Sequence, residues 1–218
     1  SALLVPAGFQ RAIGGLNAED PCAKFPYLKF EEVLHSNLAG KGPDTGPEGI
    51  VYRTVALGAG AGAELDLEVL LVVNATSSDY RPFSPRLNGM QGKYGSINLM
   101  SGSDVKLKIT FFDHVTRAPL IMRAAALTFF DLDQGKNQQS RESVAVSGFK
   151  EWHLSTDTEV KVLRLGKGNA IFKSSTFGTG QDNPMDPQFL TPQQSNRAVS
   201  LFFENARELR VELRASPG

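Results

Sequence analysis

Apolar and polar residues alternate with a period of two along most of the chain after residue 28. The alternation is clearest at 64–69, 105–109 and 209–213. Successive side chains of a β-strand point to opposite faces, so this pattern predicts strands with one buried and one wet face. We predict strands at 28–34, 49–56, 64–73, 94–100, 104–112, 119–131, 142–147, 149–154, 158–164, 169–177, 197–203 and 207–214.

Two apolar runs, 129–130 and 201–203, break the alternation, which is typical of central strands covered on both sides. One short helix is predicted at 191–195, with Thr191 as its N-cap and Pro192 in its first position. Many short strands with almost no helix predict an all-β fold, an antiparallel β-sandwich of jelly-roll type. We expect one core that includes Leu67, Val69, Ile109, Phe111, Phe129, Val144, Val160, Phe172, Phe202 and Val211.

The first part of the chain differs from the rest. Residues 1–28 show no clear periodicity and are broken by glycine and proline, so we predict an irregular, extended N-terminal arm there. The β-sandwich domain would then occupy residues 29–218, a length that suffices for one well-filled sandwich. Such an arm would lie against its own domain or against a partner. Asn88-Gly89 is predicted as one of the turns between strands.

Composition narrows the classes of partner. The chain has 23 basic and 23 acidic residues, which removes the usual electrostatic case for nucleic acid. Cys22 is the only cysteine, so no internal disulfide can form, and no apolar run approaches the ~20 residues of a transmembrane helix. The chain begins at Ser1 without an initiator Met. We therefore expect a processed protein targeted through the secretory route or to an organelle.

The strongest candidate site is acidic. Asp131 and Asp133 follow an apolar strand, and Glu142 opens the next one. If the two strands pair as a hairpin, three carboxylates meet at its mouth and repel one another unless a cation compensates. Hard oxygen ligands suit Ca²⁺, so we predict a structural calcium site at these three residues. The alternative is neutralisation by Lys136 and Arg141 without a metal.

Catalysis finds little support in the sequence. His35, His114 and His153 lack the spacing of a zinc site. Asp131 and Glu142 could form a glycosidase pair, but no cleft lined by aromatic residues is evident, and we expect no enzyme. The stiff loop 182–184 could present polar groups to a sugar. Exposed aromatic residues could stack on one: Tyr80, Phe83 and Tyr94 are the candidates.

Several segments resemble a module of secreted or organelle-targeted proteins of single-celled algae. The resemblance rests on 44–52, on 88–89 with 95–99, on 129–135, and on 182–184 leading into 197–199. It implies a jelly-roll β-sandwich without catalytic residues. It also implies a place in an algal assembly, either as an extrinsic subunit of a photosynthetic complex in the plastid lumen or as a surface or shell component.

These observations predict a non-catalytic structural or accessory subunit. Its partners would be other protein subunits, contacted through the N-terminal arm and the loop surfaces. The alternative is a calcium-dependent carbohydrate-binding module, which would use the acidic residues and exposed aromatic side chains to hold a glycan. No nucleic acid and no transmembrane segment are expected in either case.

Overall fold

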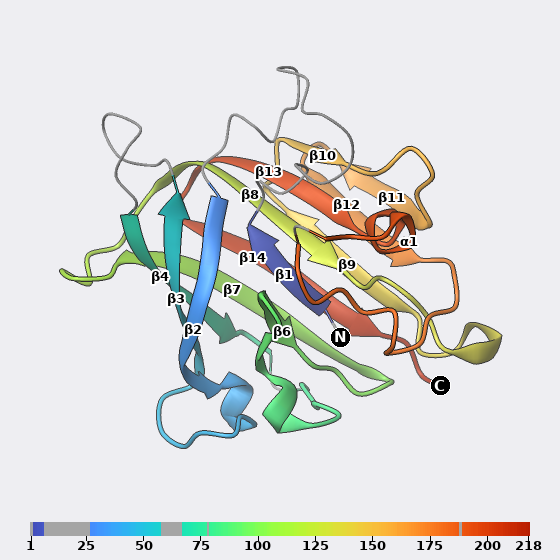
Figure 1. Ribbon diagram of the computed structural model, residues 1–218, viewed down its shortest axis with the longest axis horizontal. Coiled ribbons are helices and arrows are strands. Elements are labelled where there is room, and N and C mark those ends of the chain that lie inside the picture. Colours follow the sequence, from blue (N-terminus) through green and yellow to red (C-terminus); the bar gives the residue numbers. More distant parts are fainter. Residues whose placement is uncertain (1, 7–26, 58–66, 78, 188) are drawn as a thin grey trace.

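The computed structural model describes residues 2–6, 27–57, 67–77, 79–187 and 189–218 (Figure 1). In these residues nearly all regular structure is β-strand, and the named strands pair antiparallel, so the predicted all-β antiparallel sandwich is confirmed. The jelly-roll type stays a prediction. The helical elements are α1 (Pro192–Asn196) and the 3₁₀ turns η2 (Leu38–Gly40), η3 (Pro85–Leu87) and η4 (Lys136–Gln138).

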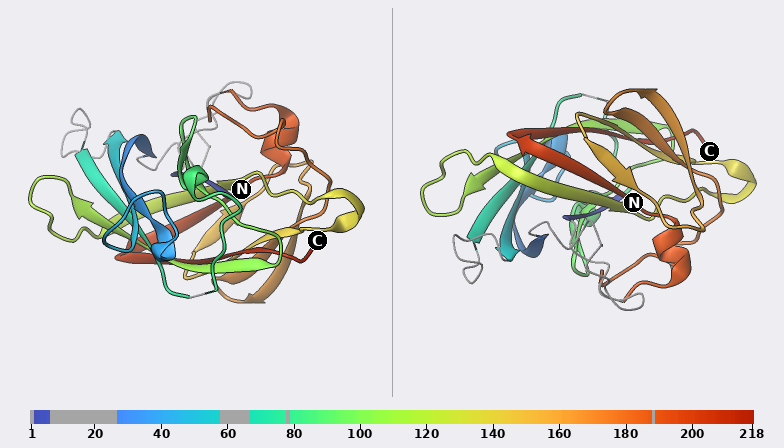
Figure 2. Two further views of the ribbon diagram at one scale, coloured as in Figure 1. Left: turned by 90° about the horizontal axis from the view of Figure 1, so that it is seen from below. Right: turned by 90° about the horizontal axis from the view of Figure 1, so that it is seen from above.

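The strands form two sheets that pack face to face (Figures 1 and 2). The six-stranded sheet has the spatial order β10 (Glu151–His153), β13 (Val199–Ala206), β8 (Met122–Phe130), β1 (Ala2–Pro6), β6 (Tyr94–Ile97), β5 (Gly89–Gln91). The eight-stranded sheet has the order β11 (Val160–Gly166), β12 (Asn169–Ser174), β9 (Glu142–Ser147), β14 (Glu208–Ala215), β7 (Ser103–Asp113), β4 (Leu67–Ala75), β3 (Gly49–Leu57), β2 (Tyr27–Asn37).

One hydrophobic core lies between the sheets, as the alternation predicted. Eight of the ten expected residues belong to it, and full burial of such side chains stabilises by roughly 1.5–3 kcal/mol each. Phe202 is also buried, but its neighbours Leu201 and Phe203 face the core, so Phe202 points to the opposite face of β13. The expectation for Leu67 is wrong. It is the first residue of β4 and is 38% exposed, because β7 pairs with β4 only from Val69 onward and leaves this end of the strand without a neighbour on that side.

Most predicted strands are present, with ends that differ by a few residues, and β9 has the predicted bounds. The turn prediction at Asn88-Gly89 is wrong. Asn88 ends the 3₁₀ turn η3, and Gly89 begins the three-residue strand β5. The chain reverses instead at Gly92, whose φ of +58° suits a glycine.

The predicted N-terminal arm is partly incorporated into the sandwich. β1 lies between β6 and β8 and pairs with both, so residues 2–6 are a central strand of the smaller sheet. β2 likewise begins at Tyr27, inside the predicted arm. A run of only five residues is too short to reveal a strand by periodicity, which is why the sequence did not predict it. Positions 7–26 of the arm, Cys22 among them, lie outside the described residues.

Candidate functional site

Segment 131–141 crosses from one sheet to the other. The calcium prediction assumed that the strands on either side of this segment pair as a hairpin, and they do not: β8 pairs with β1 and β13, whereas β9 pairs with β12 and β14. β8 ends at Phe130, and Asp131 has a left-handed backbone with φ of +64°, so Asp131 and Asp133 do not continue the strand.

The three predicted carboxylates nevertheless lie near enough at this corner to influence one another's charge. The Glu142 amide donates a hydrogen bond to the Asp133 carbonyl at 3.1 Å. Burial, with a smaller contribution from the nearby Glu142 and Asp133, raises the pKa of Asp131 to about 8. Burial and then Glu142 raise the pKa of Asp133 to about 7. At neutral pH the corner therefore retains protons that an exposed pair of carboxyl groups would have lost.

Arg197 supplies positive charge to this corner, and sequence analysis missed it. Its guanidinium is buried and donates from Nε to Glu159 Oε2 at 2.8 Å and from Nη1 to Asp182 Oδ2 at 2.5 Å. Asp133 Oδ2 lies 3.9 Å from Nη1, and Nη2 donates to the Phe177 carbonyl at 2.7 Å. We call Asp133, Glu159, Asp182 and Arg197 the Arg197 cluster.

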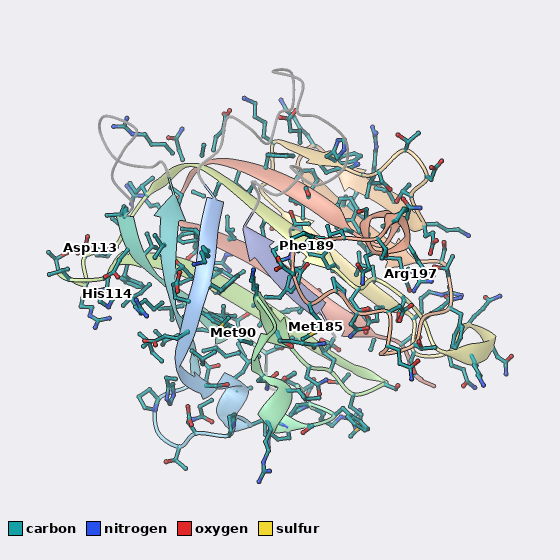
Figure 3. All side chains as sticks on the ribbon, viewed as in Figure 1. Met90, Asp113, His114, Met185, Phe189 and Arg197 are labelled. Carbon is teal, nitrogen blue, oxygen red and sulfur yellow. The ribbon has the colours of Figure 1, made fainter. Side chains whose placement is uncertain are left out.

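Local structure fixes the position of this arginine. Thr191 caps α1 in a capping box with Gln194, and the Arg197 amide closes the helix on the Gln193 carbonyl. Figure 3 shows Arg197 beside this helix, at the opposite end of the molecule from Asp113 and His114. Glycine at position 178 lets its loop lie against Asp133, because a Cβ at this position would lie 1.7 Å from Asp133 Oδ2. The alternative partner Arg141 instead donates to Gln134 and Gln138.

The raised pKa values predict that stability falls with rising pH. Asp131 and Asp133 ionise near pH 4 in the unfolded chain but near pH 8 and pH 7 in the folded protein. Their contribution is therefore fully present below about pH 4 and is lost as the pH rises through about 8. Asp131→Asn should flatten this loss by up to about 1.4 kcal/mol per pH unit, measured by urea unfolding between about pH 5 and about pH 8.

The matched control for that experiment is Asp157→Asn, which changes an exposed carboxylate outside the corner. It should keep the wild-type pH dependence. If Asp131→Asn also keeps it, Asp131 is already ionised in the folded protein, and the protonated corner is ruled out.

The calcium site stays a prediction. In the described part of the chain, no three His, Cys, Asp or Glu side chains are grouped so that they could hold a metal ion. A cation would compete with the protons of the corner, so its effect should be largest at about pH 8. If Ca²⁺ binds there, it should raise the melting temperature of the wild type and not that of Asp133→Ala. Equal melting temperatures in chelator and in calcium would eliminate the site.

A second feature lies on the outer face of the eight-stranded sheet, where two hollows of about 270 and 300 Å³ adjoin. They share Ala145 and Glu212, so they form one groove across β7, β14, β9 and β12. We call it the basic groove. Its side chains are Thr76, Lys106, Lys108, Arg141, Ser143, Ala145, Ser147, Leu165, Asn169, Ile171, Lys173, Arg210, Glu212, Arg214 and Ser216.

Side-chain size along one strand explains the groove. The outward positions of β9 are all small, namely Ser143, Ala145 and Ser147. The strands on either side carry longer outward side chains, such as Arg210 on β14 and Lys173 on β12. Since neighbouring strands lie about 4.8 Å apart, these long side chains rise on both sides of β9 and leave a trough above it.

Positive charge is concentrated in the basic groove although the whole chain has no net charge. Six basic side chains line it, against the single carboxylate of Glu212. Arg214 pairs with Glu212 and Arg210 with Glu208. For the lysines of the groove, at positions 106, 108 and 173, the described residues offer no ion-pair partner. The net charge of the chain therefore did not predict this basic surface, because acidic residues elsewhere balance it.

The remaining sequence candidates lie elsewhere. Tyr80 and Tyr94 are buried and cannot stack on a glycan, whereas Phe83 is exposed. Asp182 serves Arg197 rather than an external ligand. His114 pairs with Glu68 at 2.9 Å (Nδ1 to Oε2), far from the Arg197 cluster (Figure 3).

Comparison with known proteins adds no family to these observations. No known family model, curated protein or solved structure matches the chain. Among the described residues, none of the helices has the length and apolar character needed to cross a bilayer.

Proposed function

We propose that the protein is a non-catalytic binding module that holds a short segment of an anionic polysaccharide in the basic groove. The concentration of six basic side chains over a floor of small residues, on a chain without net charge, carries this proposal. Lysine and arginine can bind carboxylate or sulfate groups with charge-assisted hydrogen bonds.

The uncharged lining also suits a sugar. Thr76, Ser143, Ser147 and Asn169 offer hydroxyl and amide groups that can exchange hydrogen bonds with sugar hydroxyls. Proteins that bind single-stranded nucleic acid stack bases on aromatic side chains, and the described lining of the groove contains none. A charged glycan therefore fits the lining better than a nucleic acid.

Two considerations support binding without catalysis. Glycoside hydrolysis usually requires two carboxyl groups at the scissile bond, whereas the described groove carries one, which Arg214 already holds at 2.7 Å. None of the corner carboxylates lines the groove, and Asp131 is buried. Glu142 lies two residues before the buried Val144 on β9, so it is on the inner face of the strand. The neighbouring Arg141 instead lines the groove.

The proposal predicts charge-dependent glycan binding. Dextran sulfate should bind, and uncharged dextran of the same length should not, when both are titrated by calorimetry at low salt. Binding should weaken as ionic strength rises, because the screening length falls to about 10 Å at 0.1 M salt. Equal affinity for both polymers, or tighter binding of a single-stranded oligonucleotide than of dextran sulfate, would overturn the proposal.

A second candidate function is the subunit of a larger assembly that the sequence predicted. The observation in its favour is the exposed edge strand β11, which carries Leu163 and Leu165 on its outer face. Binding of a glycan and association into an assembly are compatible, because the groove runs over β7, β14, β9 and β12, whereas association would use the edge strand β11, and Leu165 alone belongs to both.

A further inference from the structure

The two sheets have four edge strands, and β11 differs from the other three. β5 and β10 contain three residues each, too few for stable pairing with another chain. β2 is interrupted by two register shifts, and Val33 in β2 lies 3.2 Å from where a Cβ on Gly89 of β5 would be, so these two edges face each other. β11 has seven residues and regular pairing from Val160 to Arg164, and a single register shift at Leu165, between Arg164 and Gly166, lies at its end.

The outer face of β11 carries two exposed leucines beside Lys161, at positions that are usually polar in an edge strand. Leu163 is 48% exposed and Leu165 is 61% exposed, and Leu163 lies opposite Ile171 of β12. Edge strands of monomeric proteins are normally protected by charges, bulges or covering segments. Trp152 of β10 packs against Arg164, which covers only the inner face of β11. In the described residues, no backbone hydrogen bond from outside the sheet reaches positions 161–165.

We propose that two copies of the chain associate by antiparallel pairing of β11 with β11 about a two-fold axis at Leu163. In this register Leu163 lies opposite its own copy, and Lys161 lies opposite Leu165 of the partner subunit, which stands at the register shift that ends the regular part of β11. The two apolar leucines are then covered on each side, while the like charges of Lys161 and its copy lie four residues apart, at about 13 Å. The pairing is therefore self-complementary, as a two-fold interface requires.

Association would also extend the binding surface. Leu165 lies at the end of the basic groove, next to the edge of the sheet. Pairing through β11 joins the two eight-stranded sheets into one and brings the two grooves onto a continuous face. A polymer that reaches both grooves would bind with avidity. The association itself needs no glycan, so it can fail or succeed independently of the proposed function.

Sedimentation of the full chain without glycan tests the inference. The wild type should be dimeric at micromolar concentration, and Leu163→Lys/Leu165→Lys should be monomeric with an unchanged melting temperature, since both side chains are exposed. The matched control Leu34→Lys changes an exposed leucine of the β2 edge and should stay dimeric. A monomeric wild type, or a double variant that is as dimeric as the control, would overturn the inference.

A crosslink provides a second measurement that does not depend on the double variant folding. Opposite residues of paired strands have Cα atoms about 4.5–5.5 Å apart, within the range of a disulfide. Leu163→Cys, made together with Cys22→Ser, should therefore form a covalent dimer on mild oxidation. Leu34→Cys in the same background should not. Absence of the Leu163→Cys crosslink, or equal crosslinking of both variants, contradicts the two-fold pairing at Leu163.

Discussion

Replacing Arg197 by alanine is expected to lower the free energy of unfolding by about 3–5 kcal/mol. The side chain is buried and holds Glu159 at 2.8 Å and Asp182 at 2.5 Å. Without the guanidinium, Glu159 and Asp182 lose their shared counter-charge. Both carboxylates then remain beside Asp133, whose pKa is already raised. Loss of the guanidinium also frees the Phe177 carbonyl, so the loop between β12 and α1 loses its anchor. Urea unfolding at neutral pH measures the change.

Two further variants separate this role from a general effect of losing an arginine. Arg197→Lys keeps the charge but loses the planar fork, so its destabilisation should lie between wild type and Arg197→Ala. Arg164→Ala removes an exposed arginine that stacks on Trp152, a contact worth about 0.5–1 kcal/mol. If Arg197→Ala costs no more than Arg164→Ala, the Arg197 cluster does not stabilise the fold.

Deletion of residues 1–6 should destabilise the protein to a similar extent. β1 pairs with β6 on one side and β8 on the other, so its removal divides the six-stranded sheet and exposes two strand edges. Each lost backbone hydrogen bond is worth about 0.5–1.5 kcal/mol, and the total should reach at least about 3 kcal/mol. Thermal unfolding followed by circular dichroism measures the loss.

A peptide added in trans provides the control for this deletion. A synthetic peptide with the sequence of residues 1–7 should restore part of the lost melting temperature, because it can occupy the position between β6 and β8. A scrambled peptide of the same composition should not. An unchanged melting temperature after deletion would mean that these residues lie outside the sandwich, as the sequence alone suggested.

Local alternation explains why most strands could be predicted. In β7 the buried Val105, Leu107 and Ile109 alternate with polar residues, and this pattern is visible without knowledge of the fold. The missed strands β1 and β5 have five and three residues, too short for a period to show. Which strands pair is not local information. Nothing in segment 131–141 reveals that β8 and β9 belong to different sheets.

The candidate sites show the same limit. Asp131, Asp133 and Glu142 were identified from sequence because they lie close together along the chain. Arg197 was not, since its partners Glu159 and Asp182 lie 38 and 15 residues away. The basic groove had a visible signal, the small outward residues of β9. That signal acquires meaning only when the sheet order places β9 between the longer side chains of β12 and β14.

The most direct test of the central claim is the affinity for dextran sulfate after charge reversal in the groove. Lys108→Glu/Lys173→Glu changes one lysine in each hollow. The control Lys41→Glu/Arg86→Glu makes the same change in charge at two exposed positions that do not line the groove. A charge-assisted hydrogen bond is worth about 1.5–3 kcal/mol, so the groove variant should bind at least roughly tenfold more weakly while the control binds like the wild type. Equal loss of affinity in both variants, or no loss in the groove variant, would contradict binding in the basic groove.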